Sequence, residues 1–555
     1  MMKKKFGIFV IVLLVLSVGS VFGYYRLANR GKLGLNMYSI ERTLSLPEEE
    51  IDLGTPKTFH MYRNKIDDMA EEILRRMEKD HIRADYESIP VISEYLFDEL
   101  GFESVETADD PEDLFLHTVI DKKRGYCLSL SVLYLALAER VGLPLYGVVV
   151  PGHFFVRYDD GQRRFNIETT SKGGNAPDEH YIEKFKPPKT ENTIYMKNLT
   201  KLQTIGCFFN NLGNSYSTVG EIDTAIEELE RAVRINPLLT EAHTNLGNMY
   251  LKKGWTRDAI DQYLQSLNIV GDDAKVHYNL ANAYSQTGRY GEAIFQYKKA
   301  IELKADFVDA YRNMANIYRK QKVFSKAILE LKMAARVKPD DSETYKQLGD
   351  VYRDMQDYAS AITQYNRALR IEPDSFGANI SLAYSYLDTG KLEDAVARFI
   401  TTIRLDPSEP GAYFGLALAY NKLGWTDDEI EAYLQLLVIE PGMVAALQNL
   451  GNAYISAQMY GEAIEQYLRA VEIEPTDSQL HYNLGVAYAN MELYEEAISR
   501  YLRAVEIDPK NAAAHNGLAI GYYMLKQYDD ARQHVRIAQK LGFDVNKELL
   551  KALKM

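Results

Sequence analysis

The sequence predicts a mainly α protein: an α-solenoid superhelix of ten helical hairpins, preceded by a small α+β domain and an N-terminal hydrophobic segment. Three observations lead to this prediction. A Leu or Met followed by Gly or Ala recurs every 34 residues over the last three-fifths of the chain. The segment before this array lacks that period and changes from helical patterns to a hairpin pattern. An apolar run follows three lysines at the start of the chain.

The repeated Leu or Met marks one position in each of the ten hairpins, which we expect over residues 204–541. The markers are Leu212, Leu246, Leu280, Met314, Leu348, Leu382, Leu416, Leu450, Leu484 and Leu518. A tyrosine follows each marker by four residues, from Tyr216 to Tyr522. Leu and Tyr four apart share one helix face, and the small residue beside the Leu allows a second helix to approach closely.

Two further positions complete the repeat. An Ala follows the marker by 13 residues in nine of the ten repeats, and a Pro follows it by 25 residues in seven, where it ends the second helix. In the seventh repeat Glu429 replaces the Ala and Leu436 replaces a later small residue, so we expect looser packing there. Residues 542–555 are expected to form a short helix that caps the array.

This pattern resembles the tetratricopeptide repeat family from about residue 204 to residue 540. Asn recurs on one face of the first helix of each repeat, just before the marker and two residues after it. These residues are Asn211, Asn214, Asn245, Asn248, Asn279, Asn282, Asn313, Asn316, Asn449, Asn452 and Asn483. The resemblance implies that this face is concave and binds the main chain of polypeptide clients, because an amide both donates and accepts hydrogen bonds. The alternative is that the Asn side chains bond to one another between repeats.

Residues 48–190 form a separate α+β domain. Helical spacing covers residues 65–79 and 92–100, and a third, buried helix begins at Cys127 and ends at Gly142. A Cys at a helix N-terminus lies in the field of the helix dipole, which favours the thiolate. The second cysteine, Cys207, falls inside the array and is expected to be a small core residue. The two cysteines provide no disulfide framework, although one bond between them stays open.

A β-hairpin follows the buried helix. It consists of residues 153–158, a turn at residues 159–161 and residues 162–170, after an earlier strand over 145–150. If Asp160 and Gly161 form a two-residue loop, His153 lies directly opposite Glu168, within reach of a hydrogen bond. Cys127, His153 and Glu168 are the residue types of a cysteine nucleophile site.

The segments Gly125-Tyr-Cys-Leu-Ser-Leu-Ser and Pro151-Gly-His-Phe-Phe-Val-Arg are similar to the transglutaminase-like superfamily, in its SirB1-type branch. The resemblance implies a papain-like triad of Cys127, His153 and Glu168. It also implies the activity of a cysteine peptidase, amidase or acyl transferase. The alternative is a degenerate domain with a structural role only.

The start of the chain is a targeting segment, predicted to span residues 1–30 and followed by a linker over residues 31–47. Three lysines precede the apolar run of residues 6–22. An uncleaved anchor over residues 6–25 is favoured by Tyr24 and Tyr25, and a signal peptide cleaved near Gly23 is the alternative. The first case places the rest of the chain on the exported side of the cytoplasmic membrane, and the second makes it secreted or periplasmic.

The 555 residues carry a formal net charge of −14, with 46% hydrophobic and 26% charged residues. A folded chain of more than one unit is expected at this length and composition. No Lys/Arg stripe is present to neutralise phosphates, so no nucleic acid partner is predicted. No metal site and no cofactor is predicted. We therefore expect an exported, membrane-tethered scaffold that holds polypeptide clients and acts on them through its thiol site, or a non-enzymatic assembly protein.

Overall fold

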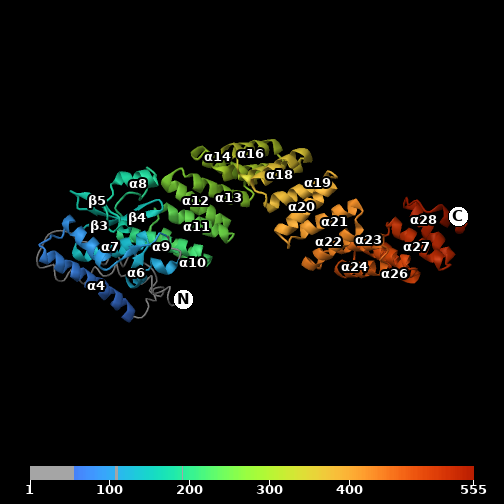
Figure 1. Ribbon diagram of the computed structural model, residues 1–555, viewed down its shortest axis with the longest axis horizontal. Helices are drawn as coiled ribbons and strands as arrows, with labels where there is room; N and C mark the ends of the chain where they lie inside the picture. The colour runs from blue at the N-terminus through green and yellow to red at the C-terminus, as the bar shows by residue number, and fades with distance from the viewer. Residues whose placement is uncertain (1–55, 107–109, 191) are drawn as a thin grey trace. The chain divides into compact units, whose positions relative to one another are not determined.

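The computed structural model describes residues 56–106, 110–190 and 192–555, in two compact units (Figure 1). The first unit extends to Ala310 and the second runs from Tyr311 to Met555. The predicted anchor at residues 6–25 and the linker at residues 31–47 lie outside the described residues. Within the described ranges, no helix is long and apolar enough to cross a membrane.

The first unit begins with an α+β domain in which short helices precede a small sheet. Its helical elements are α4 (Pro56–Lys79), η3 (Tyr86–Ser88), α5 (Ile89–Ser93), η4 (Glu94–Glu99), η5 (Pro111–Leu114), α6 (Leu116–Lys122), α7 (Cys127–Val141), η6 (Thr169–Ser171) and α8 (Asp178–Phe185). Its strands are β1 (Glu103–Ser104), β2 (Arg124–Gly125), β3 (Leu145–Val150), β4 (His153–Asp159) and β5 (Arg164–Ile167). The helix predicted from Cys127 therefore begins where the sequence indicated and ends at Gly142, whose φ is +85°.

The core of this domain lies between α7 and one face of the three-stranded sheet β3-β4-β5. Leu133 and Leu137 of α7 are fully or almost fully buried and belong to one apolar cluster with Val156, Tyr158 and Ile167 of the sheet. The opposite face packs against α8, through Phe155 and Tyr181 (Figure 1). A connector over residues 192–199 extends the sheet, because the Leu199 amide donates to the Gly147 carbonyl at 2.9 Å.

The predicted hairpin register is wrong by two residues. Val156 pairs with Ile167 and Asp159 pairs with Arg164, so the loop contains four residues, 160–163, rather than two. The Asp160 carboxylate accepts hydrogen bonds from the amides of Gln162 and Arg163 and so stabilises the longer loop. A shift of two preserves the faces of the strand, so the inward and outward residues are unchanged.

The rest of the described chain forms ten consecutive helical hairpins, as predicted. In the first unit they consist of α9 (Lys201–Thr218), α10 (Ile222–Ile235), α11 (Thr240–Lys252), α12 (Thr256–Val270), α13 (Ala274–Gln286) and α14 (Tyr290–Leu303). The boundary between the units falls within α15 (Val308–Lys320). The second unit continues with α16 (Phe324–Val337), α17 (Ser342–Asp354), α18 (Tyr358–Ile371), α19 (Phe376–Asp388), α20 (Leu392–Leu405), α21 (Pro410–Leu423), α22 (Thr426–Ile439), α23 (Val444–Ser456), α24 (Tyr460–Ile473), α25 (Ser478–Asn490), α26 (Tyr494–Ile507), α27 (Ala512–Met524), α28 (Tyr528–Lys540) and α29 (Lys547–Ala552).

The small residue after each marker allows the two helices of a hairpin to pack closely. A Cβ atom added at Gly247 would lie 2.7 Å from the ring of Tyr263, and one at Gly451 would lie 2.5 Å from the ring of Tyr467. Each of these rings comes from the second helix of the same hairpin. At these two positions the glycine allows the aromatic ring to lie directly against the first helix.

One hydrogen bond recurs in every hairpin turn, and another recurs at six of the junctions between hairpins. The carbonyl of the repeated tyrosine accepts from the amide five residues later in the same turn, as at Tyr250 and Trp255 (2.8 Å). After the second helix, the carbonyl of the repeated proline accepts from a side chain six residues later. The donors of this second bond are His243, Tyr345, Asn379, Tyr413, His481 and His515.

The seventh repeat accommodates its two departures inside the core. Glu429 is 4% exposed and accepts two hydrogen bonds from the Asn421 amide, both at 3.1 Å, while Leu436 is fully buried. Burial raises the pKa of the Glu429 carboxyl. A carboxyl therefore occupies a position that is Ala in the other nine repeats. At the end of the chain, Leu553 after α29 is buried against Val535 and Ala538 of α28.

Candidate functional site

Cys127 is the first residue of α7, and the segment before it is held in place by β-pairing and a hydrogen bond. β2 pairs with β1 in a short parallel ladder, and the Tyr126 amide donates to the Ser129 hydroxyl at 2.9 Å. A Cβ atom at Gly125 would lie 2.9 Å from that same hydroxyl, so the chain passes closely over the first turn of α7. The Cys127 side chain is 5% exposed, and its sulfur lies at the positive end of the helix dipole.

His153 is the first residue of β4, where the chain reverses after β3. It pairs with Val150 in the sheet. Its ring stacks on Phe185 of α8, with 5.1 Å between ring centroids and 1° between the ring planes. Tyr181 of α8 flanks the same ring at 6.2 Å. The sheet edge and α8 together fix the orientation of the imidazole.

Glu168 lies beyond the end of β5, where the chain leaves the sheet and enters η6. Its Oε2 atom accepts from His153 Nε2 at 2.7 Å and from the Tyr181 hydroxyl at 3.1 Å. Its Oε1 atom accepts from the Thr170 hydroxyl at 2.6 Å and from the Thr170 amide at 3.2 Å. The predicted contact between His153 and Glu168 therefore forms, although the two residues are not direct strand partners. Four donors stabilise this one carboxylate.

The partners of Glu168 determine which nitrogen of His153 carries a proton. Burial raises the pKa of Glu168, but hydrogen bonds from His153 and Thr170 outweigh burial and hold that pKa below its usual range. An ionised carboxylate can only accept, so Nε2 of His153 is the donor. In the neutral ring, Nδ1 is then the unprotonated nitrogen.

The thiol and the imidazole interact. Burial lowers the pKa of His153, but its interactions with Cys127 and with Glu168 outweigh burial and raise that pKa to about 9. Burial, together with the neighbouring Cys127, raises the pKa of the Tyr126 hydroxyl to about 12. The structure thus brings together all three predicted residues of the thiol site. Their arrangement suits transfer of the thiol proton to His153, with Glu168 stabilising the imidazolium.

The other predicted cysteine, Cys207, has a different environment. It is 2% exposed in α9, and burial raises the pKa of its thiol. Both cysteines are free in the structure, so the disulfide that the sequence left open is not formed. Cys207 is confirmed as a core residue.

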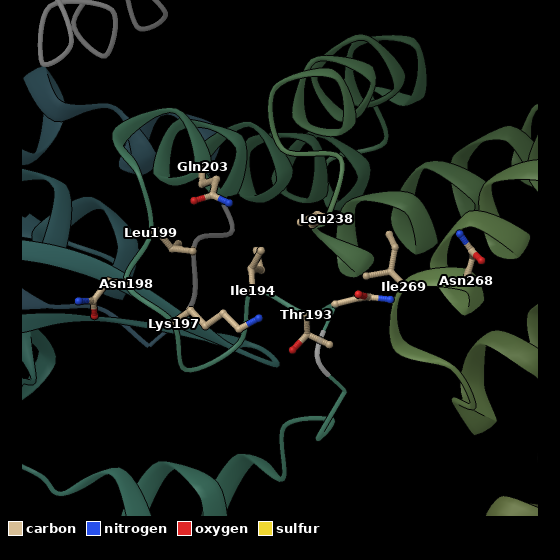
Figure 2. A pocket seen from close by; sticks show the side chains of 10 residues that line it. Thr193, Ile194, Lys197, Asn198, Leu199, Gln203, Leu238, Asn268 and Ile269 are labelled. Atoms are coloured by element: carbon tan, nitrogen blue, oxygen red, sulfur yellow. The ribbon is translucent and has the colours of Figure 1, made fainter. Parts of the chain in front are cut away.

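A pocket of about 370 Å³ lies elsewhere in the first unit, between the connector and the first two hairpins (Figure 2). Figure 2 labels Ile194 on the connector, Leu238 between α10 and α11, and Ile269 near the end of α12 among its lining residues. Cys127 and His153 do not line this pocket. The thiol site and this pocket are therefore separate features.

Several of the predicted Asn residues of the first unit form hydrogen bonds within the array. The Asn245 amide donates to Asn210 at 2.9 Å, and the Asn279 amide donates to the Asn248 carbonyl oxygen at 3.0 Å. The same Asn248 oxygen accepts from the Tyr263 hydroxyl of α12 at 2.7 Å. Bonds between neighbouring repeats, the alternative that the sequence left open, thus exist, but they occupy the carbonyl oxygen of Asn248 rather than its N–H groups.

The second unit repeats the tyrosine contact. The Tyr467 hydroxyl donates to the Asn452 carbonyl oxygen at 2.7 Å. In the fifth repeat Asp350 replaces the Asn, and the Tyr365 hydroxyl donates to it at 2.9 Å. In these repeats the tyrosine hydroxyl bonds to an acceptor two residues after the marker, and an Asn provides that acceptor while its two N–H groups project from the same side chain.

Family comparisons agree with this division of the chain. A model described as the transglutaminase-like superfamily matches residues 60–202. Models described as TPR repeat and tetratricopeptide repeat match residues 209–254, 281–322, 349–390, 380–444, 451–492 and 493–526. The chain carries a transglutaminase-like domain followed by tetratricopeptide repeats.

Among curated proteins, the chain is similar to a UPF0162 protein of Xylella fastidiosa (strain Temecula1), with 28% identity over 188 residues. This match covers 29% of the chain and 63% of that relative, so the chain spans less than two thirds of the relative's length. Among solved structures, MamA shares 26% identity with a TM-score of 0.30, over 31% of this chain and 95% of that one. YrrB, described as a TPR protein with an unusual peptide-binding site, shares 21% identity with a TM-score of 0.29, over 33% and 95% of the two chains.

Two kinds of residue in the transglutaminase-like domain and the tetratricopeptide array escaped the sequence analysis. Tyr181 and Thr170 complete the bonds to Glu168, but neither has a spacing that points to the hairpin. The tyrosines that hold the Asn side chains, such as Tyr263 and Tyr467, do have a signal. They lie 17 residues after the marker, and the 34-residue period could have identified them.

Proposed function

We propose that the tetratricopeptide array binds polypeptide clients through the Asn-bearing face of its first helices. The observation that carries this proposal is the orientation of the amides of Asn248 and Asn452. Their carbonyl oxygens accept from Tyr263 and Tyr467, which leaves N–H donors for the carbonyl groups of an extended peptide. Such donors recognise main chain and tolerate differences in client sequence.

The fifth repeat suggests the experiment. Asn248→Asp and Asn452→Asp keep the acceptor for the tyrosine, as Asp350 does naturally, but remove the N–H donors. The double variant is expected to keep the thermal midpoint of the chain and to lose at least tenfold in affinity for arrays of random 15-residue peptides, because about 1–2 kcal/mol is at stake per lost bond to a peptide carbonyl. Gln265→Glu, an exposed substitution on α12 that adds one negative charge, as each Asn→Asp change does, is the control. Equal binding by the double variant and the control would refute this mechanism.

We further propose that the transglutaminase-like domain acts on a bound client through Cys127. In the first step His153 Nδ1 takes the thiol proton, and the sulfur attacks the carbonyl carbon of a client amide. The C–N bond then breaks, the amine leaves with the proton from His153, and a thioester remains on Cys127. Water or another nucleophile cleaves the thioester and gives its proton to His153. In this proposal, the backbone amides at the N-terminus of α7 stabilise the developing oxyanion.

Thiol reactivity tests this proposal without knowledge of the client. Iodoacetamide at pH 6 is expected to alkylate Cys127 at least ten times faster than a model thiol, because His153 takes the thiol proton as the sulfur attacks. His153→Ala should lower the rate to that of a model thiol or below. Cys207 provides the internal control, because its buried thiol should stay unlabelled in the folded chain. An unchanged rate in His153→Ala would contradict the proposal.

A non-enzymatic assembly protein is the second candidate, and the burial of Cys127 favours it. The side chain is 5% exposed, and the ring of His153 is stacked against α8. In that case the triad only stabilises the junction of α7, the sheet and α8. Slow alkylation of Cys127 at pH 6, together with a lower thermal midpoint in His153→Ala, is the expected pattern for this candidate.

We also propose that residues 6–25 anchor the chain and place the domain and the array on the exported side of the membrane. The apolar run after three lysines supports this proposal. Protease added to intact cells after permeabilisation of the outer barrier should degrade the array. If the array is degraded only after lysis of the cytoplasmic membrane, the proposal is wrong.

A further inference from the structure

Tyr501, in the second helix of the ninth repeat, lacks the acceptor that three of its counterparts have. Tyr263, Tyr365 and Tyr467 each donate to an Asn or Asp on the preceding helix. The corresponding residue in the ninth repeat is Val486, which has no polar atom. Across the described part of the chain, the Tyr501 hydroxyl finds no hydrogen-bond partner, although the residue is only 4% exposed. The Tyr501 hydroxyl is therefore available to a partner from outside the chain.

The neighbourhood of Tyr501 is hollow. A pocket of about 390 Å³ lies between α25, α26 and α27, and its lining includes Tyr482, Val486, Tyr501, Asn516, Ile520 and Met524. Gly485 and Gly517 lie against the Tyr501 ring, where an added Cβ would approach within 2.6 and 2.7 Å. The two glycines therefore let α25 and α27 enclose the ring from both sides.

The lining is neutral and mostly apolar. None of its residues carries a charge, and Ile520 and Met524 are 40% and 46% exposed at its rim. Asn516 adds one polar group: its carbonyl oxygen is buried and, within the described residues, has no partner. An apolar wall that carries a phenol donor and an unpartnered carbonyl oxygen matches a peptide group beside an apolar side chain.

We infer that this pocket binds a bulky apolar side chain, such as Leu or Phe, of a client polypeptide, with Tyr501 donating to a client carbonyl and Asn516 accepting from a client amide. This inference rests on the proposed polypeptide binding by the array. It adds a specificity site to a face that otherwise recognises main chain. A charged side chain is excluded, because the lining offers no countercharge and would desolvate it.

Continuity with the Asn-bearing face supports a polypeptide as the occupant. Asn483 precedes the marker of the same helix, α25, and Asn452 lies on α23, two helices earlier. At the corresponding positions of the ninth and tenth repeats the Asn residues are replaced by Val486, Ile520 and Gly517. A peptide held by the eighth repeat thus reaches the pocket along the same row of helices.

Peptides of one length and one variable residue test the inference. The probes are fluorescein-labelled nonapeptides of alternating Ser and Gly, with Ala, Leu, Phe, Asp or Lys at the centre, and the readout is fluorescence anisotropy on the full chain. The Phe and Leu peptides are expected to bind roughly 10- to 100-fold more tightly than the Ala peptide, from burial of one large side chain. The Asp and Lys peptides should bind no better than the Ala peptide.

Val486→Asn converts the ninth repeat to the pattern of the eighth and provides Tyr501 with an acceptor. It should lower the preference for Phe over Ala to within twofold, leave the Ala peptide unaffected, and not reduce the thermal midpoint. Met524→Asn, at the exposed rim, should reduce the preference in the same direction and cannot unfold the repeat. Leu502→Asn, a 42% exposed position on α26 outside the pocket, is the control.

The outcomes separate the two proposals. Binding of all five peptides with equal affinity, or a Phe preference that survives both Val486→Asn and Met524→Asn, overturns the pocket and leaves polypeptide binding intact. Failure of every peptide to bind the unmodified chain overturns both.

Discussion

The thiol site and the tetratricopeptide array build buried polar contacts in opposite ways. The site at Glu168 is made once, from residues far apart in the sequence: α7, the start of β4, the end of β5 and α8 each contribute a group. The array forms its contacts from residues at fixed spacing and repeats them. Tyr467 reaches back 15 residues to Asn452, and Tyr263 reaches Asn248 over the same interval.

The difference determines how a substitution can be interpreted. In the single-copy site, removal of one group leaves the others buried and unpaired, so the loss is large and shared. In the array, each position occurs ten times with different side chains, and one repeat shows what another would tolerate. Asp350 already shows that a carboxylate can replace the Asn beside the tyrosine.

The largest expected effect comes from Glu168→Leu. It leaves His153, Tyr181 and Thr170 without their acceptor, and it should destabilise the transglutaminase-like domain by about 3 kcal/mol, the cost of leaving a buried charge without its partner. Hydrogen–deuterium exchange of the α7 amides measures this loss. Tryptophan fluorescence would not report on this domain, because both tryptophans, Trp255 and Trp425, lie in the array.

The matched control is Asp98→Asn, which removes an exposed ion pair with Lys172 (3.2 Å) and should cost less than about 1 kcal/mol. If Glu168→Leu and Asp98→Asn change α7 protection equally, the closed network is not a source of stability.

The second prediction concerns pH. The pKa of His153 is about 9 in the folded chain, above the value near 6.5 expected on unfolding, so its contribution is complete below about pH 6.5 and disappears as pH rises through 9. The lowered pKa of Glu168 acts at the other end, since its contribution is lost as pH falls below about 4. Protection of α7 should therefore fall by roughly 2 kcal/mol between pH 7 and pH 10.

Glu168→Gln should reduce this dependence, because the neutral amide no longer favours the imidazolium. Protection of the array helices gives the background change over the same pH range. A fall of equal size in Glu168→Gln would show that another group titrates.

The contrast between repeated and single-copy contacts also explains which features could be predicted from the sequence. The ten markers and their ten tyrosines defined every hairpin, because one correct assignment of helices to the 34-residue period applies to all ten repeats. The start of α7 at Cys127 also followed from the sequence, because Gly125 and the apolar run after it define the helix N-terminus. These features depend on local spacing.

The hairpin register did not follow, since Asp-Asp-Gly is compatible with loops of two and four residues. The side-chain bonds of Asp160 to the amides of Gln162 and Arg163 select the longer one. The contact between His153 and Glu168 then forms because the chain leaves the sheet after Ile167 and turns back into η6. Neither that turn nor the arrival of Tyr181 from α8 is encoded in a spacing.

The third prediction brings the seventh repeat closer to the other nine. Glu429→Ala removes a carboxyl that is 4% exposed and should stabilise the array by about 1 kcal/mol at pH 8. Because burial raises the pKa of Glu429, ionisation opposes folding, and the gain should grow as pH rises above about 4 until the raised pKa is passed. Urea unfolding followed by the fluorescence of Trp425, four residues away, measures it. Destabilisation at pH 8 would mean that the bonds to Asn421 outweigh the burial of the carboxylate.

The smallest effect on stability is expected at the residue with positive φ in the turn between the two helices of each repeat. The turn between the two helices needs a residue with positive φ, and five repeats place Gly there: Gly220, Gly254, Gly288, Gly390 and Gly424. The other five use larger residues, among them Gln458 with φ of +61° and Glu492 with the same angle. A side chain in this conformation costs about 1 kcal/mol relative to Gly, which is partly offset by the greater freedom of Gly in the unfolded chain.

Gln458→Gly should therefore stabilise the eighth repeat by about 0.5 kcal/mol. Gly424→Gln, the reverse change one repeat earlier, should destabilise its repeat by a similar or larger amount. The pair is measured by the same urea unfolding, and a double variant tests whether the two effects add. Opposite signs of equal size would show that adjacent repeats are interchangeable at this position. If both substitutions lower the stability, each turn has adapted to its own residue. Such adaptation is expected for the single-copy contacts around Glu168 but not for the repeated contacts of the array.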